Sequence, residues 1–163
     1  MAAAFNYWLD YANLNVRKHP ELYRVGKSEQ GVLLVEPYKS EILPYWKFKT
    51  PAMAKRAANR IYRLFLQYRK EDDFVGMDMA RKFLQMGYTR SRRYANHKSG
   101  KKYDGPVPAD KKGQSGAHGR KQLPRDIDEQ KAQSAQLFFE AWQKAKKDTR
   151  YQQLIKEHKK QYP

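Results

Sequence analysis

TPAMAKRAANRIYRLFLQYRKEDDFVGMDMARKFLQMGYTRSRRYA, residues 50–95, carries the clearest helical pattern in the sequence. Thr50 followed by Pro51 is typical of a helix start, because a hydroxyl side chain caps free backbone amides and proline fits the first turn. Apolar residues then recur at spacings of three and four, as on one face of a helix. They are Ala54, Ala57, Ala58, Ile61, Phe65 and Tyr68. The pattern predicts a helix over residues 51–70.

A second helix is predicted directly after the first. Asp72 or Asp73 is a suitable N-cap for a helix over residues 74–86. Gly87 then stands where a left-handed C-terminal cap is expected, so this helix is predicted to end there. A short third helix is predicted over residues 89–95.

The part of the chain before residue 50 has the features of short strands. Residues 22–25 and 32–36 hold β-favouring side chains and are bounded by Gly26 and Gly31. The segment GKSEQG between them suits a hairpin loop with a glycine at each end. A third short strand is predicted over residues 45–48. These segments together predict a small antiparallel sheet.

The helical pattern is lost between residues 96 and 125. Five glycines and three prolines stand there among few large apolar side chains, so the stretch cannot bury enough surface to offset its ordering entropy. Residues 98–125 are interpreted as a flexible basic arm or a large binding loop, because ordered loops of this length are unusual in compact domains.

Two helices are expected to close the chain. Asp126 or Asp128 is a suitable cap for a helix that ends near Lys147, and a last helix is predicted over residues 149–161. The expected fold class is α+β, with a small antiparallel sheet near the N-terminus, four or five helices after it, and a long basic loop rich in Gly and Pro. Three parts are expected: an α+β core domain over residues 1–97, the arm over residues 98–125, and a C-terminal helical segment over residues 126–163 that packs on the core.

Positive charge is concentrated in one block of the chain. The 163 residues include 34 Lys and Arg against 17 Asp and Glu, a formal net charge of +17. Residues 81–125 alone hold 13 basic and two acidic residues, a net charge of +11. Because like charges repel on folding, such a block favours a polyanionic partner, and nucleic acid is the commonest one in cells.

The composition excludes several classes of protein and site. Cysteine is absent, which excludes disulfides, thiol nucleophiles and cysteine-based metal sites. No stretch approaches the ~20 apolar residues of a membrane span, and residues 1–10 lack the regions of a secretory signal. We therefore expect a cytoplasmic protein without a membrane partner. The sequence has no phosphate loop or dinucleotide fingerprint and no histidine pair at metal spacing, so no cofactor and no metal is expected.

Nucleic-acid binding is the predicted function, mainly through phosphate contacts, with low sequence specificity and DNA slightly favoured over RNA. Arginine and lysine bind phosphates, interleaved tyrosines offer faces for base stacking, and Asn and His add neutral contacts. The predicted contact residues are Arg81, Lys82, Tyr88, Arg90, Arg92, Arg93, Tyr94, Asn96, His97, Lys98, Lys101, Lys102, Lys111, Lys112, Arg120 and Lys121. The polar face of the predicted helix 51–70, with Arg56, Arg60 and Arg63, is a candidate extension of this patch.

Two alternatives remain open. The first is a metal-dependent nuclease or another enzyme acting on nucleic acid, which needs carboxylates around a cation. Its candidate residues are Glu29, Glu36, Lys39 and Glu41, or the acidic residues Asp72, Asp73 and Asp78. The second alternative is an accessory protein that docks on an acidic protein partner.

Several segments resemble an uncharacterised family of small bacterial, phage and fungal proteins, known as a domain of unknown function. The matching segments are RKHPELYRVG (17–26), EQGVL (29–33), EPYK (36–39) continuing to Pro44 and Trp46, DDFVGMDMARK (72–82) and RRYANHK (92–98). The resemblance covers residues 5–103. It implies a single evolved domain and no particular activity, so it assigns no functional residue.

Overall fold

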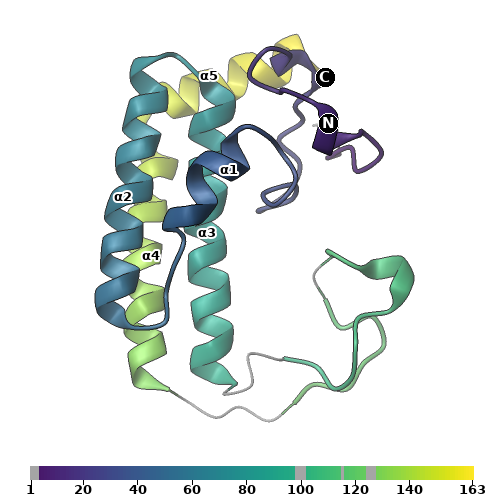
Figure 1. The fold of residues 1–163 in the computed structure, drawn as a ribbon, viewed down its shortest axis with the longest axis vertical. Helices are drawn as coiled ribbons and strands as arrows, with labels where there is room; N and C mark the ends of the chain where they lie inside the picture. The colour runs from purple at the N-terminus through teal and green to yellow at the C-terminus, as the bar shows by residue number, and fades with distance from the viewer. Residues whose placement is uncertain (1–3, 98–101, 115, 124–127) are drawn as a thin grey trace.

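The computed structural model is built from helices and describes residues 4–97, 102–114, 116–123 and 128–163 (Figure 1). Five α-helices occur in these residues: α1 (Tyr38–Ile42), α2 (Pro51–Lys70), α3 (Phe74–Asn96), α4 (Glu129–Lys147) and α5 (Thr149–Gln161). Short 3-10 turns lie at Tyr11–Asn13, Pro20–Leu22, Leu43–Tyr45 and Ala109–Lys111. None of the helices in the described part is long and apolar enough to cross a membrane.

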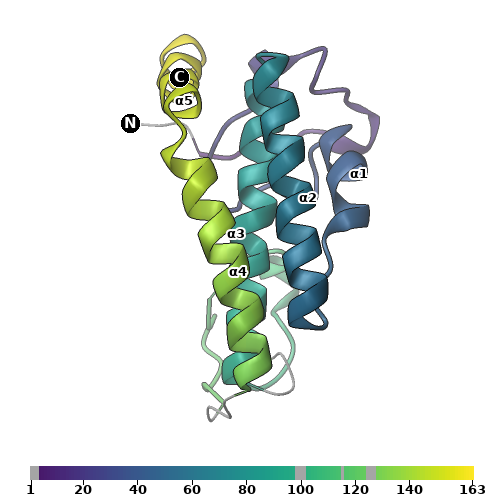
Figure 2. The same ribbon diagram turned by 90° about the vertical axis from the view of Figure 1, so that its left-hand side faces the viewer.

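Helices α2, α3 and α4 form a three-helix bundle. Both ribbon views show the three helices side by side, and each of them contacts the other two (Figures 1 and 2). The short helix α5 runs across one end of the bundle, and the N-terminal segment, residues 4–50, covers α3. The buried apolar side chains of all these elements form one core. Helix α3 is therefore the central element of the fold.

Side-chain caps start the four long helices where the sequence indicates. Thr50 Oγ1 accepts from the Met53 amide at 3.2 Å, and Asp73 accepts from the Gly76 amide at 3.1 Å. Asp128 and Asp148 make the equivalent bonds at the starts of α4 and α5. The predicted helices over 51–70 and 149–161 are confirmed with these bounds.

The predicted break at Gly87 is wrong, because α3 continues through it to Asn96. A Cβ atom at Gly87 would lie 2.4 Å from the ring of Phe138 on α4, far inside contact distance. The glycine is required for the close approach of two helices and does not end one. A cap and a packing glycine look the same in a single sequence.

The predicted α+β class is also wrong, because the N-terminal segment forms successive turns instead of a sheet. The amides of Gln30, Val32 and Leu34 donate to carbonyls three residues earlier, so they are not available for a strand ladder. Residues 45–48 likewise leave a 3-10 turn and run irregularly into α2. The valines of the expected strands are buried, but they pack on helices.

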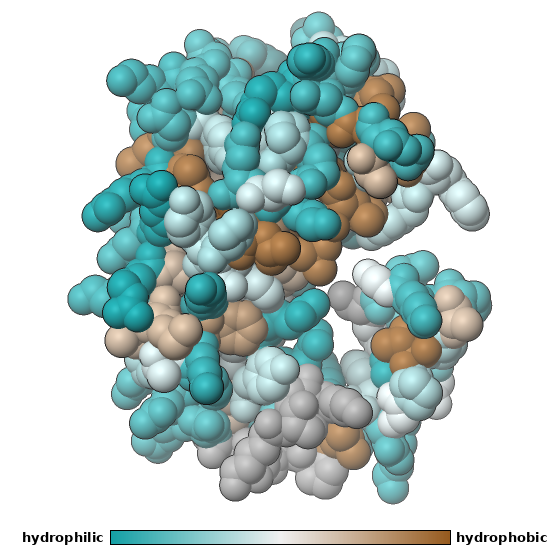
Figure 3. All heavy atoms as spheres, in the orientation of Figure 1, coloured by the Kyte–Doolittle hydropathy of each residue, from teal (hydrophilic) through white to brown (hydrophobic). Residues whose placement is uncertain are grey.

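The basic arm has local structure of its own in its described residues, 102–114 and 116–123. The chain closes on itself at an isolated antiparallel bridge between Tyr103 and Gln122. The Asp104 amide donates to the Lys121 carbonyl, and the Leu123 amide donates to the Lys102 carbonyl, both at 2.8 Å. In Figure 3 the arm forms a separate lobe, and an open notch lies between it and the N-terminal segment.

Candidate nucleic-acid interface

Helix α3 carries the basic residues of the predicted patch, but its two halves have different surroundings. Every residue from Phe74 to Gly87 is buried. From Tyr88 onward, one side of the helix reaches solvent. The charged residues of the first half are therefore enclosed in the protein, and those of the second half are accessible.

A fully buried carboxylate, Asp78, organises the charges of the first half. It accepts a short hydrogen bond from the Tyr23 hydroxyl and bonds from Tyr151 at 2.6 Å and Arg81 at 2.5 Å. The Lys82 ammonium lies 3.7 Å from its other oxygen. Burial alone would raise the pKa of Asp78, but the charges of Arg81 and Lys82 and the two hydroxyls hold it at about 2.

Lys82 ties the N-terminal segment to α3. Its Nζ donates to the carbonyl oxygens of Val25 and Gln30, each at 2.7 Å, and lies 4.9 Å from the ring centroid of Tyr23. The side chain is 0% exposed. Burial lowers the pKa of Lys82 to about 7, against the attraction of Asp78. The residue acts as an internal anchor for the turn at 25–30.

Arg81 makes the same kind of connection. Its guanidinium donates to the Ser28 carbonyl at 2.6 Å and to Gln85 at 2.8 Å, and the residue is 7% exposed. The structure thus places two of the predicted contact residues, Arg81 and Lys82, inside the core network and not on a surface. Neither side chain can reach a ligand on the surface.

The second half of α3 brings Arg90, Arg92, Arg93 and Tyr94 to the surface. None of the ion pairs found between described residues involves these three arginines. Partial desolvation lowers the pKa of Arg93, and the charge of Arg90 lowers it further. Two guanidinium groups are therefore crowded together, with the half-buried carboxylate of Glu29 as their acidic neighbour.

The remaining predicted residues of this block have mixed positions. Tyr88 packs against Phe139 and Trp142 of α4, so it belongs to the core. Asn96 is the last residue of α3, and His97 is buried. Lys98 and Lys101 lie outside the described residues.

An aromatic segment beside α3 belongs to the same surface, although it is not among the contact residues predicted from the sequence. Trp46 and Phe48 lie in the linker between α1 and α2, and Phe48 comes within 6.1 Å of Tyr94, centroid to centroid. The Arg90 guanidinium lies 5.8 Å from the Trp46 ring centroid. The sequence does contain a signal for a binding site here, because YWKFK interleaves aromatic and basic residues. The same residues also fit the strand that the sequence predicts over 45–48.

The arm supplies further cations to the same end of the molecule. Arg120 lies over the Tyr103 ring at 5.1 Å and donates to the carbonyls of Gly105, Gly116 and Ala117, so it holds the arm together. The predicted lysines of the arm that fall in described residues are exposed: Lys102, Lys111, Lys112 and Lys121. Tyr103 is also an electrostatic neighbour of Arg93.

The acidic residues of the nuclease alternative are dispersed. Glu36 accepts from the Ser40 amide at 2.8 Å, and Glu41 forms a two-bond ion pair with Arg17. Glu29 accepts from the Thr89 hydroxyl at 3.0 Å. Among the residues with described positions, no three acidic or histidine side chains gather closely enough to hold a metal ion. Each carboxylate has a local structural partner instead.

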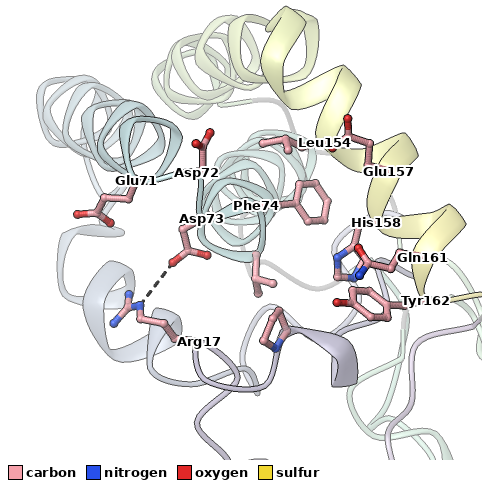
Figure 4. A pocket seen from close by; sticks show the side chains of 12 residues that line it. Arg17, Glu71, Asp72, Asp73, Phe74, Leu154, Glu157, His158, Gln161 and Tyr162 are labelled. Carbon is pink, nitrogen blue, oxygen red and sulfur yellow. Dashed lines mark hydrogen bonds and ion pairs between the residues drawn. The ribbon is translucent and has the colours of Figure 1, made fainter.

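A cleft of about 450 Å³ lies at the other end of α3, between its first turn and α5 (Figure 4). Glu71, Asp72, Asp73 and Glu157 line it, and Arg17 is paired with Asp73 at 3.4 Å. The cleft therefore presents carboxylates, but the same end of the molecule also carries cations, because Arg69, Lys70 and Arg150 line a neighbouring pocket.

A family model for a domain of unknown function, DUF4385, matches residues 6–161. The chain belongs to this family. The DUF4385 match extends beyond the N-terminal segments that carry the sequence resemblance and includes the arm, α4 and α5. No curated protein and no solved structure matches the chain.

Proposed function

We propose that this DUF4385 domain binds nucleic acid, mainly through the phosphate backbone, with the second half of α3 and the arm. The observation that carries the proposal is the contrast within α3. Arg81 and Lys82 both form ion pairs with Asp78, whereas Arg90, Arg92 and Arg93 take part in none of the ion pairs between described residues. A phosphate backbone supplies the negative charge that these arginines lack.

The cost of crowding positive charge supports a binding role for this end. The charge of Arg90 lowers the pKa of Arg93, and exposed lysines of the arm add to the same positive field. The C-terminus of α3 offsets part of this repulsion, because a helix dipole favours cations at its last turn. An approaching polyanion would offset the rest.

The chemistry of the surface favours low sequence specificity. Its cations are spread over a helix end, a linker and an arm, an arrangement that suits phosphates along a backbone more than the base edges of one groove. Phosphate contacts set position and affinity, but they carry no base information. The proposal therefore concerns DNA and RNA alike.

The test is a binding titration with a charge-matched control. Arg90, Arg92 and Arg93 are replaced together by Gln, and binding to a labelled 20-mer is followed by fluorescence anisotropy at 100 mM salt. The control replaces Lys156, Lys159 and Lys160, exposed residues of α5, with Gln, so that both proteins lose three positive charges. We expect a loss of about tenfold or more for the arginine variant and a much smaller loss for the control.

The proposal requires that the arginine variant lose more affinity for nucleic acid than the lysine control does. Equal losses in the two variants would mean that net charge alone attracts the ligand. No measurable binding by the unmodified protein to any nucleic acid would overturn the proposed function. Thermal melting of both variants must first show that they are folded.

A further inference from the structure

Exposed aromatic rings and arginines alternate along one strip of the proposed interface. The strip begins at Tyr45 in the turn before α2, which precedes Trp46 in the chain. From Trp46 it continues through ring contacts to Phe48 and then to Tyr94 on α3. The Trp46 and Phe48 centroids are 4.9 Å apart, and those of Phe48 and Tyr94 are 6.1 Å apart. The strip therefore joins two elements that are separated by almost 50 residues of sequence.

The two ends of the strip are open to solvent, and its middle is fixed in the core. Tyr45 is 39% exposed and Tyr94 is 37% exposed, both high values for large aromatic side chains. Trp46 donates from its indole nitrogen to the Phe83 carbonyl at 3.0 Å, and Phe48 packs against Phe138. The partly buried rings of Trp46 and Phe48 thus anchor the strip to the core.

Arginines lie against the rings of the strip. The Arg60 guanidinium lies 4.7 Å from the Tyr45 centroid, and Arg90 lies 5.8 Å from the Trp46 centroid. Arg93 is an electrostatic neighbour of Tyr94. None of these arginines appears among the ion pairs of the described chain. Tyr45, Trp46 and Tyr94 thus each combine a flat apolar surface with a nearby cation.

This combination suits unpaired nucleotides better than a duplex. A base of a single strand can place its face on an aromatic ring while its phosphate meets the adjacent cation. In a duplex the base faces are stacked on each other, and exposing one requires unstacking, which costs free energy. Rings beside phosphate-binding arginines add affinity for a single strand that they do not add for a duplex.

We propose that the strip from Tyr45 to Tyr94 is a stacking site for single-stranded nucleic acid, an inference that rests on the proposed function. Tyr45 and Tyr94 each receive a base, and Arg60, Arg90 and Arg93 neutralise the phosphates between them. The same pairing of ring and arginine recurs in the arm at Tyr103 and Arg120, which continues the path of the strand beyond α3.

The test compares how one pair of substitutions changes the affinity for single-stranded ligands and for a duplex. Tyr45→Ala and Tyr94→Ala are combined, and anisotropy titrations are made with dT12, U12 and a 12-base-pair duplex. The control is Trp8→Ala, which removes a 95% exposed ring in the N-terminal segment, outside the strip. We expect the double variant to lose at least about tenfold in affinity for dT12 or U12, and less than about twofold for the duplex. The control should change none of the three.

The two single strands identify the natural chemistry of the ligand. A larger loss with U12 assigns the site to RNA, a larger loss with dT12 assigns it to DNA, and similar losses show recognition of unpaired bases in general. Equal losses on single strands and duplex, or no loss on either, would overturn the stacking site while leaving phosphate binding intact. If the unmodified protein binds none of the ligands, the proposed function itself fails.

Discussion

The ammonium group of Lys82 donates to the backbone carbonyl of Val25 at 2.7 Å, across 57 positions of sequence. The same group donates to Gln30, so one side chain of α3 fixes both ends of a turn in the N-terminal segment. This arrangement explains why the segment forms no hairpin. The carbonyls at both ends of the turn are directed to the lysine, and the amides inside it are bonded locally.

Replacing Lys82 with Met should destabilise the protein by about 2–4 kcal/mol, because it leaves two buried carbonyls without a donor and removes a counter-charge of Asp78. Urea unfolding measures the change. Lys27→Met, in the exposed part of the same turn, should cost less than about 0.5 kcal/mol. A folded Lys82→Met protein of unchanged stability would contradict the anchoring role.

Acid should weaken the protein through Asp78. Its carboxyl has a pKa of about 2 in the folded chain against an ordinary value of 3.8, so the unfolded chain takes up the proton first as the pH falls. The stabilisation of about 2 kcal/mol is complete above pH 4 and is lost as the pH falls toward 2.

Tyr151→Phe tests this link directly. The substitution removes the hydroxyl that donates to Asp78 at 2.6 Å, which raises the pKa of the carboxyl and moves the acid unfolding midpoint to higher pH. Circular dichroism against pH measures the midpoint. Tyr7→Phe, at a half-exposed ring, should leave it unchanged. A Tyr151→Phe midpoint equal to that of the parent would show that Asp78 does not govern acid unfolding.

Gly87→Ala should destabilise the protein by about 1–3 kcal/mol even though alanine favours helix, because the added methyl group meets the Phe138 ring at 2.4 Å. Thermal unfolding measures the effect. In a Phe138→Leu background the same substitution should cost clearly less, since the smaller side chain leaves room for the methyl group. An equal cost in both backgrounds would place the strain elsewhere.

Local signals predicted α2, α4 and α5 well, but they divided α3 at Gly87 and gave strands in the N-terminal segment, where the structure has turns. The cap at Thr50 and the apolar period up to Tyr68 specify α2 without help from the rest of the chain. At Val32 and Val35 the sequence indicates burial correctly, but burial against α-helices or against another strand gives the same pattern. Whether the segment forms turns or strands depends on the hydrogen bonds from Lys82 to Val25 and Gln30, and no local sequence pattern contains these long-range contacts.

The same limit applies to the candidate site. Arg81 and Arg90 are both arginines in a basic block, and composition cannot tell which one has an internal partner. Asp78 makes the difference between the two arginines, because it lies one turn before Arg81 and forms an ion pair with that side chain inside the core. Sequence patterns do not assign Trp46 to the site, because Trp46 lies 35 positions before the basic block and approaches Arg90 only in the folded chain.

The central claim is that the arginines at the end of α3 bind phosphates, and the salt dependence of binding tests it most directly. Log affinity should fall linearly with log salt, because each phosphate contact releases counterions. Replacing Arg90, Arg92 and Arg93 with Gln should flatten the slope by about two to three units, whereas Lys82→Met, in a folded protein, should leave it unchanged. A folded triple variant with the slope of the parent would contradict the claim.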